Sequence, residues 1–319
     1  MAIQNQVKGT LPKVSIITPS YNQALFLEQA IQSVLEQDYS NIEYIIIDGG
    51  STDGSVDIIR KYDSHLAYWV SEPDRGQYDA QNKGLRCMTG NIWAWMNADD
   101  AYLPGAISQA VEWLNQHSNH EIVYADCMNV DENGRYLCPI YTRDFNYAAM
   151  LTGSGMVPTG STFFRRKVVD QIGEFDETLH YVGDIDYLFR AGEICKFGHV
   201  PEMWSLYRIH PDARTWDREQ SAKRAVEFVR VYERFWSRSG LSPRIGYLKA
   251  QSLAKVYLYA AHLASRVDQR SLCLDYVIKS LGMGVPALRP RLLRLVIYLM
   301  LGKKVDDSIQ KFRSTKAKE

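Results

Sequence analysis

Acidic side chains follow three short apolar segments of this sequence, at Asp48, at Asp74 and at the pair Asp99–Asp100. Each apolar segment has the composition of a buried strand. Because the carboxyl ends of parallel strands meet at one edge of a sheet, we expect these carboxylates to lie at one rim. Carboxylates gathered in this way need a cation or hydrogen-bond donors, and their hard oxygens suit Mg²⁺ or Mn²⁺ bound to phosphates. The spacing therefore predicts a site for a phosphate-bearing ligand and a divalent cation.

The pair Asp99–Asp100 also has a simpler interpretation. Both residues precede a helix that is expected to begin near Leu103, and an acidic residue in that position often caps the helix. For a lone acidic pair we would favour the cap. The same explanation would have to be repeated for every acidic turn, whereas one ligand accounts for all of them. We therefore favour the ligand.

Predicted strands and helices alternate through the first 126 residues. Apolar residues recur three and four positions apart in the helices, and the strands are short apolar runs. The expected strands are 14–18, 42–47, 66–70 and 92–96, and the helices between them are 27–35, 56–59 and 77–88. This alternation predicts a parallel, doubly wound α/β sheet. Small residues in 48–54 would let the backbone approach a ligand closely.

Composition excludes several classes of protein. Lys+Arg 37 and Asp+Glu 37 balance, so the global charge gives no support for a nucleic-acid partner. The five cysteines are scattered and form no C-x-x-C pair, which argues against a disulfide framework or a zinc knuckle. Neither a dinucleotide fingerprint nor a P-loop is present. With no signal peptide and no apolar run of about 20 residues, we expect a cytoplasmic protein.

Five motifs, taken in order, resemble those of glycosyltransferase family 2. They are 14–22 (VSIITPSYN), 47–54 (IDGGSTDG), 72–76 (EPDRG), 82–84 (NKG) and 97–100 (NADD). The resemblance implies a GT-A fold, with a Rossmann-like nucleotide-sugar-binding sheet and a mixed acceptor half. It implies a catalytic domain at 1–215, divided near 126 into donor and acceptor halves. Beyond it, the helical periodicity of the apolar residues predicts a C-terminal helical extension at 216–319.

The same resemblance suggests roles for residues of the donor half. Pro19 and Tyr21 would flank the nucleotide base and Asp48 would hydrogen-bond it. The rest of the expected nucleotide-binding set is Asp74, Asn82, Asn97 and Ala98. Asp99 would hold Mn²⁺ or Mg²⁺ on the diphosphate, and Asp100 would support it or touch the sugar. Asn97 stands where the family usually has an acid, and Gly49 where a second acid often follows the first.

Within the acceptor half, 127–141 is expected to be antiparallel, with a hairpin tip at 131–134, and 161–166 is expected to lead into a helix. By resemblance, Asp184 is the base that deprotonates the acceptor hydroxyl, because an inverting transfer needs a carboxylate and a helix N-terminus keeps it ionised. Capping of that helix is a simpler role for Asp184. Gly183 replaces the usual Glu, which leaves Asp186 as a second candidate for the base.

A strand leading to Tyr207 is followed by two further candidates. A lone His is usually structural, but the family often places one here, so His210 is expected to reach the metal or the diphosphate. Arg208 could pair with phosphate or with an acid. Beyond the catalytic domain, 287–304 combines an apolar helix with basic residues. It could lie in a membrane interface near a lipid-linked acceptor, or pack on the domain or on a second subunit.

The sequence therefore predicts a metal-dependent, inverting glycosyltransferase acting in polysaccharide or glycan assembly. It would move a sugar from a nucleotide-diphosphate donor to a sugar or lipid-linked hydroxyl, in the cytoplasm or peripherally on the inner face of the membrane. A catalytically silent nucleotide-sugar-binding scaffold is one alternative. A sugar-phosphate nucleotidyltransferase is another, although 18–22 lacks the Gly-rich, basic loop that such an enzyme needs after its first strand.

Overall fold

A computed structural model describes residues 11–155, 157–215, 217, 219–284 and 289–301. The chain divides into two compact units. The first comprises Met1–Phe145, Val157–Glu177 and Ile194–Arg208, and the second comprises Asn146–Met156, Thr178–Glu193 and Ile209–Glu319. This division differs from the boundary expected at residue 215, because three segments of the expected catalytic domain, 146–156, 178–193 and 209–215, belong to the same unit as the C-terminal helices.

The first unit is built on one mixed sheet. Four parallel strands begin it, β1 (Val14–Ser20), β2 (Ile42–Asp48), β3 (Tyr68–Ser71) and β4 (Ile92–Trp95), in the order β3-β2-β1-β4. The sheet continues through β8 (Thr162–Arg165), β6 (Ile122–Val130), β9 (Phe197–Arg208) and β5 (Ala101–Tyr102), while β7 (Tyr136–Ile140) pairs with β6. The predicted α/β class and the mixed second half are confirmed.

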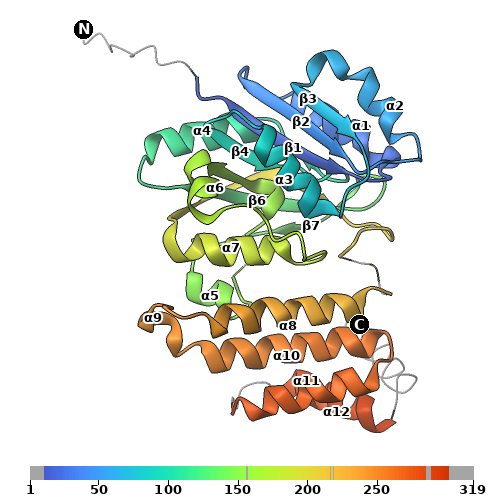
Figure 1. The fold of residues 1–319 in the computed structure, drawn as a ribbon, viewed down its shortest axis with the longest axis vertical. Helices are drawn as coiled ribbons and strands as arrows, with labels where there is room; N and C mark the ends of the chain where they lie inside the picture. The colour runs from blue at the N-terminus through green and yellow to red at the C-terminus, as the bar shows by residue number, and fades with distance from the viewer. Residues whose placement is uncertain (1–10, 156, 216, 218, 285–288, 302–319) are drawn as a thin grey trace. The chain divides into compact units, whose positions relative to one another are not determined.

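Helices cover the parallel strands on both faces (Figure 1). The helices of this unit are α1 (Ala24–Leu35), α2 (Ser55–Lys61), α3 (Gln77–Cys87), α4 (Ala106–Gln116) and α6 (Arg166–Ile172), with short 3-10 turns at Asp63–His65 and Thr159–Ser161. Side chains of α1 and α4 share one core with Ile16 and Ile46. On the other face α3 approaches closely at Gly84, where a Cβ would lie 2.4 Å from Ile17. Burial on both faces explains why β2 is largely apolar and why the polar residues of β1 are small.

Two details of the second half differ from expectation or refine it. The hairpin tip predicted at 131–134 joins β6 to β7, and Gly134 adopts φ 79° there. Residues 161–166 lead into a helix as expected, since α6 begins at Arg166. The sequence did not indicate that 162–165 form a strand first, β8, which is antiparallel to both β4 and β6. The sheet is therefore continuous from the donor half into the acceptor half.

The second unit is helical. It contains α5 (Tyr147–Leu151), α7 (Gly183–Ile194), α8 (Ser221–Ser237), α9 (Pro243–Gly246), α10 (Lys249–Arg266), α11 (Arg270–Gly282) and α12 (Arg289–Leu301). Helix α10 lies between α8 and α11 (Figure 1). Its Ser252 hydroxyl accepts from Trp236 Nε1 of α8 at 2.8 Å and donates to the Leu151 carbonyl at 2.5 Å, which ties α5 to this stack. None of the helices in the described ranges has the length and hydropathy to cross a membrane.

Candidate functional site

The carboxyl ends of the parallel strands are aligned at one edge of the sheet. In the strand register Ser20 lies opposite Asp48, and Asp48 lies opposite Ser71. The loops that follow are joined, because Asn22 Oδ1 accepts from Thr52 N at 2.9 Å and Asn22 N donates to Ser51 Oγ at 2.8 Å. Asn22 adopts the left-handed φ of 52° that this turn requires. The predicted rim therefore exists in the first unit.

Asp48 is the most deeply buried acid of this rim. Its side chain is 0% exposed. Its carboxylate accepts four hydrogen bonds, from Gly50 N at 3.1 Å, Ser51 N at 2.8 Å, Ser51 Oγ at 2.5 Å and Ser71 Oγ at 2.7 Å. Four donors fill the lone-pair sites of a carboxylate. In this arrangement Asp48 holds the 49–51 loop. The sequence suggested that Asp48 hydrogen-bonds a nucleotide base directly, and for that one of these four hydrogen bonds would have to be broken.

We expect Asp48→Asn to destabilise the fold. The new amide would direct two donors at groups that already donate, and each unsatisfied buried group costs about 1–3 kcal/mol. Urea unfolding should show a loss of about 2–3 kcal/mol in the free energy of unfolding. Asp57→Asn is the matched control, because Asp57 has a side chain 76% exposed and should change stability by less than about 0.5 kcal/mol. Equal stabilities of the two variants would contradict this account.

Asp74 is brought to the same rim through Gly49. A Cβ on Gly49 would lie 2.6 Å from Asp74 Oδ2, so the absence of a side chain at 49 makes room for this carboxylate. The other oxygen of Asp74 accepts from Gly76 N at 2.8 Å. Tyr21, 58% exposed, follows the end of β1, and Pro19 lies buried within that strand. An exposed aromatic ring and an acid beside a glycine are groups that could stack on and hydrogen-bond a heterocyclic base.

The loop after β4 carries the acidic pair. Asp100 is 4% exposed, and its carboxylate accepts from Arg208 N at 2.9 Å and Asn97 Nδ2 at 2.9 Å. Burial, and then the neighbouring Asp99, raise the pKa of Asp100. Asp99 is only partly buried. Helix α4 begins later, with Gly105 as its N-cap and β5 in between, so neither acid caps it. The capping interpretation is therefore wrong.

The acidic loop offers a divalent cation few side-chain ligands of its own. Among the residues that the structure describes, no three His, Cys, Asp or Glu side chains come together as a metal site. Asn97 Oδ1 accepts from Gln77 Nε2 at 3.1 Å, so the amide braces the loop. Asp99 is then the accessible carboxylate. Mg²⁺ and Mn²⁺ are commonly held by one or two carboxylates together with substrate phosphates, and this donor set is of that kind.

Asn82 of the expected site has a structural role instead. Asn82 is 1% exposed, donates from Nδ2 to Phe175 O and Glu177 Oε1, each at 3.0 Å, and accepts from Phe175 N at 2.9 Å. Its amide is engaged with 175–177, so we leave it out of the nucleotide site. Ala98 is also buried, at 3% exposure, and offers a ligand little surface.

Arg208 is the other such residue, and it is 2% exposed. Its guanidinium donates to the carbonyl oxygens of Asp99 at 2.8 Å and Asp131 at 3.1 Å and to Gln29 Oε1 at 2.6 Å. The expected pairing with phosphate is therefore not what this side chain does. It holds the end of β9 against the acidic loop.

Sequence reasoning missed the role of Gln77, whose Nε2 donates to Asn97 Oδ1. Nothing in its residue type distinguishes it from any other polar residue at the start of a helix.

The remaining candidates belong to the second unit. Asp184 lies in the first turn of α7, where the N-terminal dipole favours a carboxylate, and its Oδ1 accepts from Ile185 N at 2.9 Å. Asp186 is 8% exposed and pairs with Arg190 Nε at 2.9 Å and Arg234 Nη2 at 2.6 Å. Those two ion pairs commit Asp186 to contacts within the second unit. His210 is 4% exposed and follows the end of β9.

The sequence matches a known family and named relatives. The family profile described as Glycosyl transferase family 2 matches residues 15–173. An uncharacterized glycosyltransferase of Rickettsia prowazekii is 31% identical over 234 residues, which cover 71% of this chain and 71% of that protein. An uncharacterized glycosyltransferase of Mycobacterium tuberculosis is 34% identical over 188 residues, covering 58% of this chain and 71% of that protein.

Solved structures with a similar fold include two transferases. A mannosyltransferase from Pyrobaculum calidifontis in complex with GDP-Man and Mn²⁺ matches with a TM-score of 0.59 at 18% identity, over 92% of this chain and 88% of that chain. S. aureus TarS in complex with UDP-GlcNAc matches with a TM-score of 0.57 at 15% identity, over 86% and 93%. A longer TarS chain matches at 0.62 and 17% identity, but this chain covers only 54% of it. At these identities the likeness establishes the fold, which is the GT-A fold predicted from the sequence.

Proposed function

The chain belongs to glycosyltransferase family 2, and on that premise we propose that it is an inverting, metal-dependent enzyme with a nucleoside-diphosphate-sugar donor and a hydroxyl acceptor. That it is a glycosyltransferase with a GT-A fold follows from the family and from the structural neighbours. The observation that carries the finer proposal is the rim of the first unit. There a partly buried Asp99, an exposed Tyr21 and the Asp74 carboxylate beside Gly49 follow the ends of parallel strands.

In this proposal the rim binds the nucleoside diphosphate. Tyr21 packs on the base and Asp74 accepts a hydrogen bond from it, while Asp48 holds the loop between them. The structural neighbours in complex with GDP-Man and Mn²⁺ and with UDP-GlcNAc support a donor of this class. Asp99, with His210 as a second candidate, would hold a divalent cation that neutralises the charge of the leaving diphosphate. Arg208 and Asn97 keep Asp99 in place through the contacts described above.

The transfer is a single displacement at the anomeric carbon. Asp184 accepts the proton of the acceptor hydroxyl as the acceptor oxygen bonds to that carbon. The bond from the carbon to the diphosphate oxygen breaks, and its electron pair leaves with the nucleoside diphosphate. Because attack and departure are on opposite faces of the sugar, the anomeric configuration inverts. Asp184 is proposed over Asp186 because the latter is held between two arginines.

A panel of UDP-, GDP- and dTDP-sugars tests this function. With Mn²⁺ and a mixture of sugar and lipid-linked acceptors, the protein should release nucleoside diphosphate and form a glycoside of inverted anomeric configuration. A glycoside of retained configuration would overturn the inverting mechanism. Donor binding without release across the whole panel would favour the nucleotide-sugar-binding scaffold, and incorporation of a sugar phosphate into a nucleotide would favour the nucleotidyltransferase.

Gly49→Ala should weaken nucleotide binding with little effect on stability. The backbone at 49 tolerates Ala, but the new Cβ would lie 2.6 Å from Asp74 Oδ2, so the carboxylate must move. Loss of one hydrogen bond to a charged group corresponds to about a tenfold increase in the Kd of nucleoside diphosphate, measured by calorimetric titration. Gly246→Ala, where a Cβ meets nothing within 4 Å, should leave the Kd unchanged. An unchanged Kd in Gly49→Ala would remove Asp74 from the site.

The proposed acceptor belongs to polysaccharide or glycan assembly and is a sugar or a lipid-linked hydroxyl. An apolar stripe on α11 supports peripheral contact with the inner face of the membrane, since Leu274, Ile278 and Leu281 are each about half exposed, at 47%, 59% and 57%. On α12, Leu293 and Met300 are also exposed. Of the predicted 287–304 segment, 287–288 and 302–304 lie outside the described residues. Binding to vesicles containing anionic lipid tests this contact.

A further inference from the structure

The segment that carries Asp184 is attached to helix α8 at three points. Glu227, Arg230 and Arg234 of α8 contact residues on both sides of Asp184. Resting on the role proposed above for Asp184, we propose that these three residues are positioning residues for the base. Helix α8 would then be part of the catalytic apparatus, although nothing in the sequence of the C-terminal region resembles a catalytic motif.

Glu227 makes the central attachment. It is 8% exposed. His180 N donates to both of its carboxylate oxygens, to Oε1 at 2.8 Å and to Oε2 at 3.0 Å, and Tyr181 N donates to Oε2 at 2.7 Å. Both amides precede α7, which begins at Gly183, so they lie outside the hydrogen bonds of that helix. Hydrogen bonds from backbone amides to a buried carboxylate are charge-assisted and short. Glu227 therefore fixes the backbone three residues before Asp184.

Arginines make the outer two attachments. Arg230 Nη2 donates to the Thr178 carbonyl at 2.8 Å and to its hydroxyl at 3.1 Å. Arg234 Nη2 donates to Asp186 Oδ1 at 2.6 Å, and Arg190 Nε donates to the other oxygen at 2.9 Å. Residues 178, 180–181 and 186 are thus each held, and Asp184 lies between the second and third of these points.

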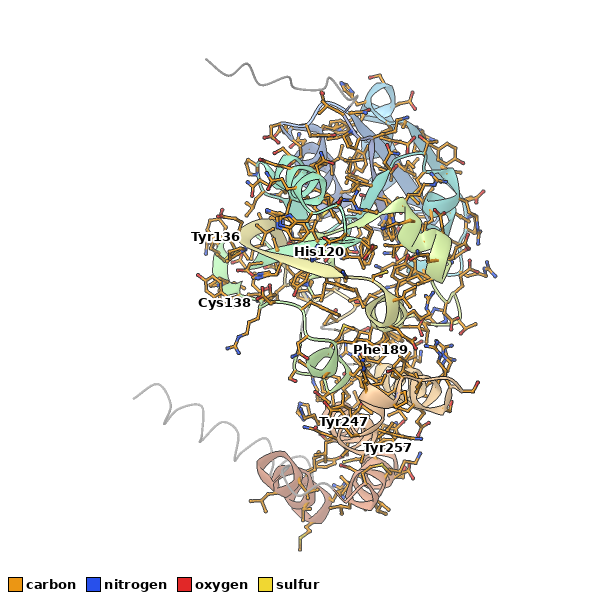
Figure 2. All side chains as sticks on the ribbon, turned by 90° about the vertical axis from the view of Figure 1, so that its left-hand side faces the viewer. His120, Tyr136, Cys138, Phe189, Tyr247 and Tyr257 are labelled. Carbon is orange, nitrogen blue, oxygen red and sulfur yellow. The ribbon has the colours of Figure 1, made fainter. Side chains whose placement is uncertain are left out.

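The spacing of the three residues explains how one helix reaches all of them. Positions 227, 230 and 234 are separated by three and four residues, so their side chains leave one face of α8. Apolar contact holds the same two helices together, because the Phe189 ring of α7 lies 5.0 Å from Tyr232 and 5.3 Å from Phe235, measured between ring centroids. Figure 2 shows Phe189 in this helical unit. The polar attachments therefore act at the N-terminal end of α7 and the aromatic contacts further along it.

The contacts imply an effect on catalysis rather than on donor binding. A general base works only within hydrogen-bond reach of the proton it removes, and a displacement of about 1 Å can lower a rate by about a hundredfold. Glu227 contacts residues 180–181, which belong to the second unit, whereas the residues of the proposed donor site belong to the first. Loss of the attachment should therefore lower kcat while the donor KM and the Kd of nucleoside diphosphate stay the same.

Glu227→Gln tests this, with Glu233→Gln as the matched control. Both residues lie on α8, but Glu233 is 45% exposed and accepts from Tyr257 of α10 instead. Glu227→Gln is expected to lower kcat about 10- to 100-fold at unchanged donor KM, and to speed hydrogen–deuterium exchange of the amides in 178–186. Glu233→Gln should change neither quantity. Arg234→Met should also lower kcat, and Arg234→Lys, which keeps a cation beside Asp186, should restore most of it.

The two readouts separate this proposal from the function on which it rests. Faster exchange in 178–186 with full kcat would overturn the positioning role even if Asp184 is the base. Unchanged exchange in Glu227→Gln would overturn the attachment itself. Transfer that survives in Asp184→Asn would overturn the proposed function, and the exchange measurement would still report on the attachment.

Discussion

Asp184→Asn is expected to lower kcat for sugar transfer by about a thousandfold, because a positioned general base contributes about 10²- to 10⁴-fold. Asparagine has the same shape and retains a side-chain oxygen, so it can still accept from Ile185 N, which Asp184 Oδ1 does at 2.9 Å. What it loses is the capacity to take up a proton. The Kd of nucleoside diphosphate and the melting temperature should therefore remain those of the unchanged protein.

The measurement is release of nucleoside diphosphate at saturating donor and acceptor. Asp170→Asn, an exposed acid on α6, is the matched control and should transfer at the full rate. Activity in Asp184→Asn close to that of the control would remove Asp184 from the mechanism. A parallel loss of nucleotide binding would also count against the assignment, since it would show that the substitution disturbs more than proton transfer.

The fold could be predicted from the sequence where burial itself sets the pattern. Strand 42–47 is a nearly continuous apolar run because both faces of the parallel sheet are covered, and 14–18 is rich in β-branched residues. The structure extends these strands to Asp48 and Ser20. Strand β8 could not be found in this way. It has four residues and pairs with β4 and β6, which are distant in sequence, so its structure depends on tertiary pairing.

The division into two units differs from the expected domain boundary for a related reason. Motif order placed α7 with the rest of the catalytic domain. The partners of α7 are the aromatic residues of α8, such as Tyr232 and Phe235, and a single sequence gives no sign of that pairing. Periodicity shows that a helix has an apolar face but does not identify what covers it.

The sequence predicted where the residues of the candidate site lie, at the ends of strands, better than it predicted what each side chain does. The positions of Asp48, Asp74 and Asp99 follow from topology alone, since each comes after a parallel strand. Roles depend on hydrogen-bond partners. Asp48 is saturated by 50, 51 and 71, and Asn82 is engaged with 175–177. Such contacts join residues from 2 to 95 positions apart, so spacing along the chain cannot reveal them.

Asp99 and Asp100 differ in burial, and this difference leads to a second large expected effect. Asp100 is buried and accepts from the Arg208 amide and from Asn97, and burial raises the pKa of its carboxyl group. Because each oxygen of Asp100 already accepts a hydrogen bond, this buried carboxyl group has less room than Asp99 to bind a cation. Asp99 is the more exposed of the two. We therefore expect the metal to depend on Asp99.

Asp99→Ala should lower kcat/KM about a thousandfold and abolish the effect of Mn²⁺ on donor binding, since a metal on the diphosphate supplies several kcal/mol of charge stabilisation. Chelation by EDTA should inactivate the unchanged protein and leave the residual rate of Asp99→Ala unaffected. Asp100→Asn is the control, because Asn can still accept from Arg208 N and should keep the response to Mn²⁺ at reduced stability. If calorimetry shows the same Mn²⁺ dependence of nucleoside-diphosphate binding in Asp99→Ala as in the unchanged protein, the cation is held elsewhere, and His210 becomes the ligand to test.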